Sequence, residues 1–408
     1  MSRLPDMSEL LLGAPRVREA YDTSTRQFND YVALLRARLH SKKITIAQAD
    51  AIFLEMESSQ ESVLTARTAL KIIEGFHNAE YLSEHLTKRG EAATITVIQP
   101  MYRETFRISP RTKDNIHGEN ALTYKLQLFD SIQKKHPNLH FRLLAVDDGC
   151  DGWGEDRLRS GIVARGIIRQ WRRSNSESKI EARTIFLAKG IADKSPLIPR
   201  GIKQTGDSVK GGSVIYGMNY ANHEWRPDTH RHIIIDSDSD LSVHPAQIPT
   251  LVRKLIDHDL IVAAGSRRET NSVGAIGAVR DARGKLFISI WQRLLPTLAS
   301  SVTDTNRGFK AIDAQFASEL VQKIRERKFP YQIELLLVAE LIRTGSVKPV
   351  AISYIDSEAL STQGEIPTQS YFDQIVGILA IAKRHHEPYD KDLERLIQVR
   401  SKLGKKAA

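Results

Sequence analysis

The sequence contains a single cysteine, Cys150, among its 408 residues. One cysteine excludes an internal disulfide, and such scarcity is typical of proteins from a reducing compartment. No stretch approaches the roughly 20 apolar residues that a membrane-spanning helix requires, and the first residues lack the basic-then-apolar pattern of a secretory signal. We therefore expect a cytoplasmic protein, for which peripheral contact with a membrane surface remains open.

Two well-known phosphate-binding signatures are also missing. Neither a GxxxxGKS or GxxxxGKT loop nor a GxGxxG loop after the first expected strand occurs. The chain carries 59 Lys and Arg against 49 Asp and Glu, and this net charge of +10 suits nucleic acid, anionic lipid or a phosphorylated ligand. A nucleic-acid-binding protein is the alternative of a different class. Clustered aspartates and the lack of an aromatic-basic platform argue against it, so no nucleic-acid partner is expected.

Glycine and proline are scarce in residues 1–90, where only three glycines and two prolines occur. Apolar residues recur there at helical spacing, as in Val63, Ala66 and Leu70. The segment Thr45-Ile-Ala-Gln48 has the form of a capping box that opens a helix. We expect residues 1–90 to form a helical module that serves packing, acceptor docking or homo-oligomer formation.

Apolar, β-branched runs alternate with helical stretches from residue 94 onward. The expected strands are Thr94–Ile98, Phe141–Val146, Thr184–Leu187, His232–Ile235 and Leu260–Ala264, with a helix around residues 120–135. This alternation predicts an α/β domain over residues 91–355 with a mostly parallel central sheet flanked by helices. Ligands bind beyond the carboxyl ends of the strands in such sheets. Residues 356–408 are expected to form a helical extension with a basic tail.

Unusual residues follow the expected strands. The first strand runs into Gln99-Pro-Met-Tyr-Arg-Glu104, and the second into Asp147-Asp-Gly-Cys-Asp-Gly152. Carboxylates at a strand end suit a ribose or a base edge, although an Asp-Gly turn is the simpler interpretation. Later, Lys210-Gly-Gly precedes a helical segment. Its glycines suit either a cradle for phosphate oxygens or an ordinary helix-entry loop.

Three aspartates on alternate positions follow the run His232–Ile235. Because alternate residues of extended chain share a face, we expect Asp236, Asp238 and Asp240 to converge. Three carboxylates repel one another unless a hard cation such as Mg²⁺ or Mn²⁺ binds them. A solvated acidic turn is the simpler alternative. His244 is a further candidate ligand, although a histidine in such a loop more often binds no metal.

These motifs together resemble family 2 glycosyltransferases of the GT-A fold, and their order is most similar to that of polyprenyl-phosphate mannosyl- and glucosyltransferases. The segments that carry the resemblance are Gln99–Glu104, Asp147–Gly152, Lys210–Met218, Asp238–Pro245, Gly265–Arg267, Asp304–Lys310 and Phe329–Leu336. They cover residues 94–355 and leave the first 90 residues outside the family core. The resemblance implies a GT-A nucleotide-diphospho-sugar transferase fold and a hexosyltransferase that uses a UDP- or GDP-linked sugar.

The resemblance also implies roles for individual residues. The residues implied to bind the nucleotide sugar are Pro100, Tyr102, Glu104, Asp147, Asp148, Lys210, Asp238 and Asp240. Asp238 and Asp240 form the DxD pair that is implied to meet Mg²⁺ or Mn²⁺, with His244 as the additional candidate ligand. The metal would neutralise charge on the departing diphosphate while the acceptor attacks the opposite face, which inverts the anomeric carbon. A retaining transferase acting on a small phosphorylated or carboxylated acceptor is the alternative enzyme.

The acceptor determines which further groups are needed. A hydroxyl acceptor requires a general base, for which Asp304 is the candidate. A phosphate acceptor requires cations instead, and residues 265–310 hold eight Lys and Arg against three Asp and Glu. Arg267, Arg280 and Arg307 are therefore the candidate acceptor-binding residues, although a solvated basic face is the simpler interpretation.

Overall fold

The computed structural model describes residues 8–15, 25–56, 61–150, 159–227, 231–275, 278–355 and 368–406. Within these ranges the side chains of residues 8, 275, 278–280, 368–370 and 401–406 are not described. The central sheet consists of β1 (Ala93–Met101), β2 (Leu139–Asp147), β3 (Glu181–Phe186), β4 (Arg231–Ser237), β5 (Val262–Ser266), β7 (Phe309–Asp313) and β8 (Val347–Ala351). A small second sheet pairs β6 (Val273–Ala275) with β9 (Ser353–Ile355).

The central sheet has seven strands in the order β3-β2-β1-β4-β7-β5-β8. The β1, β2, β3 and β4 strands are parallel, as are β5 and β8, whereas β7 runs antiparallel to both of its neighbours. All five strands expected from the apolar runs are present, and the expected helix around residues 120–135 is present as α7 (Ala121–Lys135). The prediction of an α/β fold with a mostly parallel sheet is therefore confirmed.

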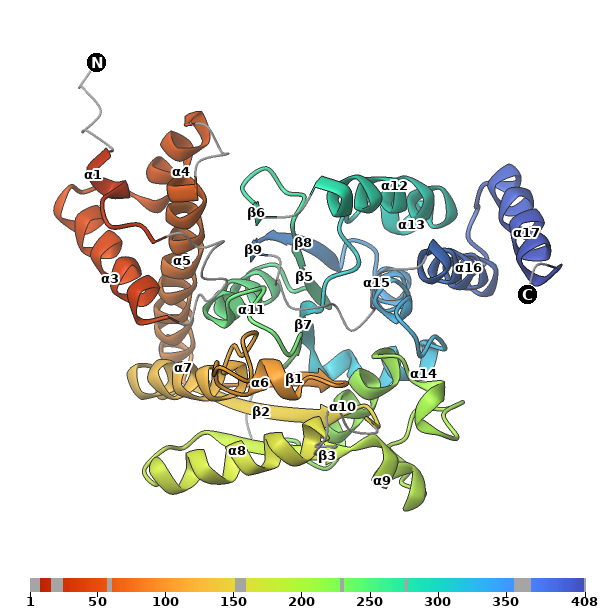
Figure 1. Ribbon diagram of the computed structural model, residues 1–408, viewed down its shortest axis with the longest axis horizontal. Helices are drawn as coiled ribbons and strands as arrows, with labels where there is room; N and C mark the ends of the chain where they lie inside the picture. The colour runs from red at the N-terminus through yellow and green to blue at the C-terminus, as the bar shows by residue number, and fades with distance from the viewer. Residues whose placement is uncertain are drawn as a thin grey trace.

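Helices cover both faces of the sheet (Figure 1). The helices α7, α8 (Ser160–Ser174) and α11 (Ile248–Asp257) contribute to the apolar cluster on one face. The other face is covered by α10 (Gly211–His223), α12 (Ala278–Leu294), α13 (Pro296–Ala299), α14 (Ala317–Lys323) and α15 (Tyr331–Ile342). Shorter helices are α6 (Thr105–Ile108), α9 (Leu187–Ala192), η1 (Thr205–Asp207), η2 (Pro245–Gln247) and η3 (Ala314–Phe316).

The N-terminal helices are α1 (Ser8–Leu11), α3 (Arg26–Ser41), α4 (Ile46–Glu55) and α5 (Glu61–Lys88). The capping box expected at Thr45 is confirmed, since its side chain and that of Gln48 bond reciprocally to the backbone. The first half of α5 packs on α3 and α4, whereas Leu82 and Leu86 in its second half lie in the core beside the central sheet. The expected domain boundary at residue 90 therefore lies just after α5, a helix that packs both on the N-terminal helices and on the α/β domain.

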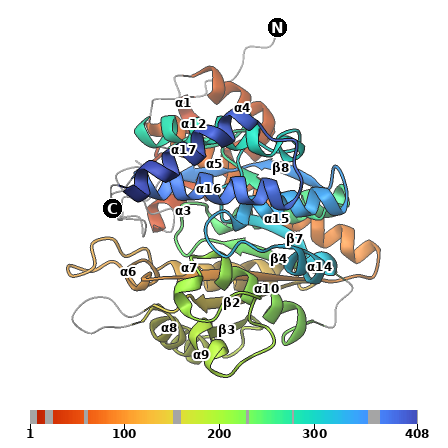
Figure 2. The same cartoon turned by 90° about the vertical axis from the view of Figure 1, so that its right-hand side faces the viewer.

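Close packing fixes α5 against the α/β domain. A Cβ at Gly75 would lie 1.8 Å from the carbonyl oxygen of Ala246 in η2, so only glycine permits this approach. Beyond β8, the helix α16 (Thr368–Arg384) lies next to α15, and α17 (Lys391–Lys406) lies next to α16, as Figure 1 shows. Figure 2 views these helices from the right-hand side of Figure 1. In the part of the chain that is described, no helix combines the length and apolarity needed to cross a membrane.

Candidate functional site

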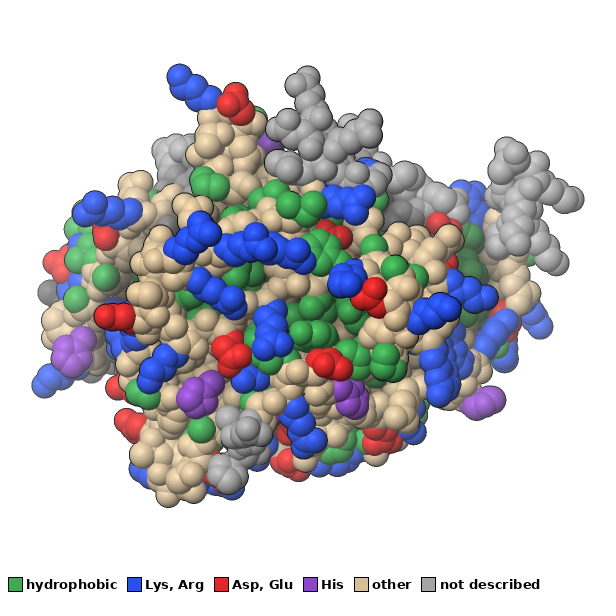
Figure 3. All heavy atoms as spheres, turned by 90° about the horizontal axis from the view of Figure 1, so that it is seen from below, with side chains coloured by type: hydrophobic (Ala, Val, Ile, Leu, Met, Phe, Trp, Pro, Cys, Tyr) green, Lys and Arg blue, Asp and Glu red, His purple; other side chains and the backbone are tan. Residues whose placement is uncertain are grey.

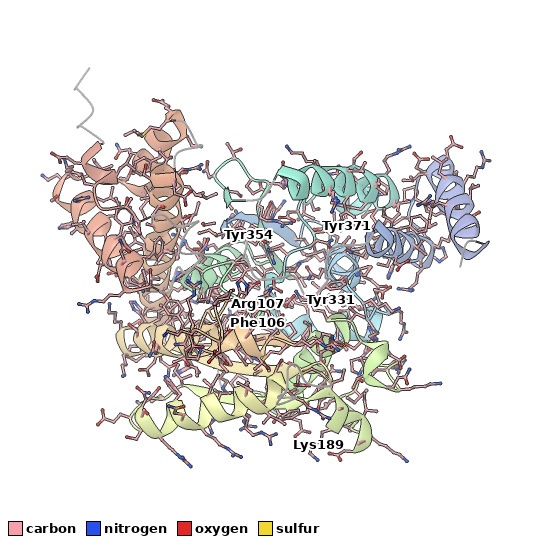
Figure 4. The ribbon with its side chains drawn as sticks, viewed as in Figure 1. Phe106, Arg107, Lys189, Tyr331, Tyr354 and Tyr371 are labelled. Atoms are coloured by element: carbon pink, nitrogen blue, oxygen red, sulfur yellow. The ribbon has the colours of Figure 1, made fainter. Side chains whose placement is uncertain are left out.

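The polar strand ends meet at one edge of the sheet. The strands β1, β2 and β4 are parallel, so their carboxyl ends lie side by side. The antiparallel strand β7 begins where β4 ends, because Ser237 pairs with Phe309. This register brings the segment Asp304–Gly308 to the loop that follows β4. In Figure 4, Arg107, Tyr331 and Tyr354 lie in the middle of the molecule, whereas Lys189 lies at its lower edge.

Asp238 lies between two cations. Lys210 Nζ donates to its Oδ1, and Arg307 Nη2 donates to its Oδ2 at 2.5 Å. Burial raises the pKa of Asp238, but the charges of Lys210 and Arg307 outweigh this effect and hold the pKa well below its usual range. Gly308 leaves room for this arrangement, since a Cβ there would lie 2.4 Å from the Asp238 carboxylate and 2.6 Å from Lys210 Nζ. Asp238 is therefore ionised and locally neutralised by the protein's own side chains.

Arg307 retains free hydrogen-bonding capacity. Its side chain is 10% exposed, and its guanidinium lies 4.4 Å from the centroid of the Tyr354 ring. Its Nε and Nη1 atoms are buried without a hydrogen-bond partner among the described residues. An unpaired donor costs free energy when it is buried, so these two nitrogens favour a ligand with oxygen acceptors.

The Lys210 loop is held by Asp148. The backbone N–H of Lys210 donates to Asp148 Oδ2 at 2.8 Å, and Ser208 Oγ donates to Oδ1 at 2.5 Å. Burial raises the pKa of Asp148 to about 6. Lys210 has a positive φ of 69°. It directly precedes α10, and this helix start is the one that the Lys-Gly-Gly motif predicted. Asp148 thus positions Lys210.

Both carboxylate oxygens of Asp147 accept hydrogen bonds from the segment that joins β2 to α8. Its Oδ1 accepts from the backbone N–H groups of Gly149 and Cys150, and its Oδ2 accepts from Gly161 N at 2.7 Å and from the Cys150 thiol at 2.9 Å. These four hydrogen bonds connect the end of β2 to the start of α8. The structure therefore gives Asp147 a loop-organising role.

The three alternate aspartates do not converge as expected. The extended chain of β4 ends at Ser237, so the alternation of side chains does not continue through the loop. Asp236 is buried beneath the site and accepts from the Tyr331 hydroxyl at 2.7 Å, and burial raises its pKa. Asp240 accepts at Oδ1 from Ser242 N and Oγ. Over the described ranges, no group of three or more His, Cys, Asp or Glu side chains is placed to hold a metal ion.

Two carboxylates nevertheless suit a metal that is completed by substrate phosphates, because Mg²⁺ typically takes one or two from the protein. The hydrogen bonds of Asp240 within the described chain reach only Oδ1, so its Oδ2 is available. Asp238 becomes available only when Lys210 or Arg307 turns to another anion. Asp238 and Asp240 could therefore contribute at most two carboxylates to a metal site.

His244 offers no free nitrogen to a metal. Its Nδ1 accepts from Ala246 N at 3.2 Å, so its proton lies on Nε2, which is 2.6 Å from the Tyr124 hydroxyl oxygen. Tyr124 in turn donates to Asn29 in α3 at 3.3 Å. Burial lowers the pKa of His244 to about 3, so the ring is neutral. The loop that follows β4 and carries Asp238 and Asp240 is called the aspartate loop below. His244 connects it to the N-terminal helices.

The end of β1 provides both a buried and an exposed part of the site. The Pro100 carbonyl accepts from Ser239 Oγ at 2.6 Å, which attaches this strand to the aspartate loop. Glu104 pairs with Arg107, and burial raises the pKa of Glu104 to about 7. Tyr102 is 40% exposed, and the Arg103 guanidinium lies 5.2 Å from the centroid of its ring.

Asp304 is engaged by an arginine. Arg267 donates to it from its backbone N, from Nε at 2.6 Å and from Nη2 at 2.8 Å, which uses both carboxylate oxygens. Burial raises the pKa of Asp304, but Arg267 outweighs this effect and lowers the pKa below its usual value. Arg267 also lies 5.3 Å from the centroid of the Tyr354 ring, on which Arg307 packs. The side chain of Arg280 lies outside the described residues.

Two buried lysines beside this site were not identified from the sequence. Lys125 Nζ donates to the Asp238 carbonyl at 2.5 Å and to Gln99 Oε1 at 3.1 Å, while Lys310 Nζ donates to Gln332 Oε1 at 2.9 Å. Burial lowers the pKa of each lysine to about 8. A signal was present, because Lys125 occupies an apolar position of an amphipathic helix and Lys310 stands inside an apolar strand.

No model of a known protein family matches the chain. The interpretation of this site therefore rests on its own residues.

Proposed function

We propose that the protein is a metal-dependent glycosyltransferase of the GT-A fold that transfers a sugar from a UDP- or GDP-linked donor to an acceptor. The observation that carries this proposal is the Asp238 carboxylate held between Lys210 and Arg307 at the carboxyl edge of the sheet. Cations gathered at this edge, beside an exposed tyrosine and two partly available aspartates, suit a nucleoside diphosphate. The resemblance of the motifs to family 2 glycosyltransferases supports the same conclusion.

The diphosphate would bind by exchange of ion-pair partners. Lys210 and Arg307 turn from Asp238 to phosphate oxygens, and the unpaired Nε and Nη1 of Arg307 gain acceptors. Asp238 and Oδ2 of Asp240 would then hold Mg²⁺ or Mn²⁺, and the metal would neutralise charge on the leaving diphosphate as a Lewis acid. Buried side-chain cations stabilise the same developing charge without reorganising solvent.

The nucleoside would lie at the ends of β1 and β2. Tyr102 is 40% exposed, and the Arg103 guanidinium lies 5.2 Å from the centroid of its ring, so the pair would border a base together with Pro100 and Glu104. Asp148 acts on the donor through Lys210, whose backbone it fixes. Asp147 acts through the loop that it organises, since all of its hydrogen bonds are internal.

The acceptor side favours an anion over a neutral hydroxyl. Asp304 would serve poorly as a general base, because both of its oxygens accept from Arg267 and its pKa is lowered. Arg267 and Arg307 pack on the same tyrosine ring, so positive charge continues from the diphosphate side of the site to the acceptor side. A phosphorylated acceptor, already ionised, needs these cations and no base. We propose inversion at the anomeric carbon, and NMR of the product distinguishes it from retention.

Thermal-shift screening of sugar nucleotides tests the proposal. A ligand that binds only the folded state at about 100 times its dissociation constant stabilises the protein by about 2.7 kcal/mol. We expect UDP- or GDP-linked sugars with Mn²⁺ to raise the melting temperature, and EDTA to reduce the shift. The exposed Asp259, which pairs with Arg343 far from the site, provides a control in Asp259→Asn. A shift that is absent for all nucleotides, or that Asp240→Asn leaves unchanged, would contradict the donor site.

A further inference from the structure

The outward face of α8 is basic. This helix carries four arginines, Arg165, Arg169, Arg172 and Arg173, and no Asp or Glu. All four are exposed, whereas the opposite side of the helix is buried against the sheet. Figure 3 views the molecule from below and shows many Lys and Arg side chains on this side, with apolar side chains and some Asp and Glu among them.

Carboxylates do not neutralise this face within the described chain. No described Asp or Glu lies within ion-pairing distance of Arg165, Arg169 or Arg173, or of Arg183 on the adjacent strand. The strand β3, which carries Arg183, is the edge strand of the central sheet. Arg165 extends the basic face of α8 to this edge, because its guanidinium lies 4.6 Å from the centroid of Phe186 at the end of β3. Arg183 lies on the opposite face of the sheet, where it donates to Tyr220 of α10. The basic face of α8 attracts an anionic partner.

An apolar side chain lies among these arginines. Ile162 is 53% exposed and precedes Arg165, Arg169 and Arg173 along one stripe of the helix. A Cβ on Gly166, in the same stripe, would meet no atom within 4 Å, so the helix backbone is accessible there. The apolar side of α8 is buried in the core, so its outward side offers charges for anionic headgroups and one isoleucine for the acyl boundary.

The aromatic ring beside this basic stripe argues against nucleic acid. Arg165 lies 4.6 Å from the centroid of the Phe186 ring. This guanidinium covers the ring on which a base of a single strand would stack. Arginines whose stems lie on apolar rings suit lipid headgroups, which need charge but no stacking surface.

We propose that the face formed by α8 and the β3 edge docks on an anionic lipid surface, with the arginines at the headgroups and Ile162 at the acyl boundary. The start of α8 is bonded to the candidate site, because Gly161 N donates to Asp147 and Ser160 Oγ accepts from Glu104 N at 2.7 Å. Docking therefore brings the site to the membrane. This inference does not depend on the reaction that the site catalyses.

Vesicle sedimentation with the full chain tests the docking face. We expect binding to phosphatidylcholine vesicles that contain phosphatidylglycerol, little binding to pure phosphatidylcholine, and weakening by salt. Each removed cation lowers the partition constant by roughly fivefold, so Arg169→Glu with Arg173→Glu should lower it at least about 25-fold. Ile162→Ser should lower it by roughly fivefold, because about half of that side chain is available for burial.

The matched control is Arg26→Glu with Arg395→Glu, which changes the net charge equally on α3 and α17. Both arginines are exposed, with side chains 95% and 78% accessible. We expect the control to bind vesicles nearly as well as the wild type. Equal losses in both double variants, or equal binding to neutral and anionic vesicles, would overturn the proposal. So would binding of single-stranded RNA through Arg169 and Arg173 without vesicle binding. Should the glutamates reduce the melting temperature, Arg169→Gln with Arg173→Gln makes the same comparison.

Discussion

Replacing Asp304 with Asn distinguishes a positioning role from a catalytic one. The substitution keeps the size of the side chain and removes its charge. In the structure, Asp304 accepts with both oxygens from Arg267, and the side chains are 2% and 16% exposed respectively. The variant therefore leaves a mostly buried guanidinium without its counter-charge.

The expected cost in stability follows from this burial. Removing one partner of a buried ion pair typically costs 3–5 kcal/mol, and we expect about 3 kcal/mol because Asn retains one acceptor oxygen. Asp281→Asn is the matched control, since Asp281 pairs with Arg268 at 2.6 Å through side chains 27% and 17% exposed. A pair nearer the surface contributes at most about 1 kcal/mol.

Urea unfolding measures both losses, and the same proteins are assayed for donor affinity and turnover. We expect Asp304→Asn to keep donor affinity near that of the wild type, to raise the acceptor KM and to change kcat by less than about tenfold. A general base would behave differently, because its removal lowers turnover by roughly 10²–10⁴-fold. Such a loss of turnover with unchanged stability would refute the positioning role, and a collapse of donor affinity would assign Asp304 to the donor site.

Three further predictions concern buried groups. Burial lowers the pKa of Lys125 to about 8, whereas an unfolded lysine titrates near about 10.4. The folded state therefore loses this proton first, so stability should rise between about pH 8 and pH 10. In unfolding measurements at several pH values, Lys125→Met should reduce that rise and the exposed Lys134→Met should not. Gly308→Ala should weaken nucleotide binding in calorimetry, because its Cβ would lie 2.4 Å from the Asp238 carboxylate, whereas Gly206→Ala, with open space around it, should leave the affinity intact. Deleting residues 1–90 should abolish cooperative thermal unfolding, since it removes Leu82 and Leu86 from the core. Deleting residues 1–60 should retain cooperative unfolding. Cooperative unfolding of the chain that lacks residues 1–90 would contradict the shared role of α5.

The strands and the location of the site were predictable because both depend on local patterns. Apolar runs marked the strands, and polar residues at their ends marked the ligand edge. The separation of Asp236 from Asp238 and Asp240 was not predictable. A two-residue period applies only to extended chain, and nothing local shows that β4 ends at Ser237.

Contacts between segments that are distant in the sequence also could not be predicted from it. Arg307 was identified as a cation of the acceptor side, but its pairing with Asp238 depends on β7 lying antiparallel to β4. The roles of Tyr124 and Asn29 at His244 depend on how the N-terminal helices pack. Lys125 was detectable in principle, since a lysine in an apolar stripe requires a buried acceptor.

Calorimetric titration with UDP and GDP, with Mn²⁺ and then with EDTA, tests the central claim most directly. We expect one nucleotide to bind with Mn²⁺ and to bind more weakly with EDTA. Lys210→Ala should lower its affinity by roughly 10- to 100-fold, because a charge-assisted hydrogen bond contributes about 1.5–3 kcal/mol. Lys203→Ala, in the preceding exposed loop, should bind as the wild type does. Failure of both nucleotides to bind, or equal affinities of Lys210→Ala and the wild type, would contradict the assignment of this site to a nucleotide sugar.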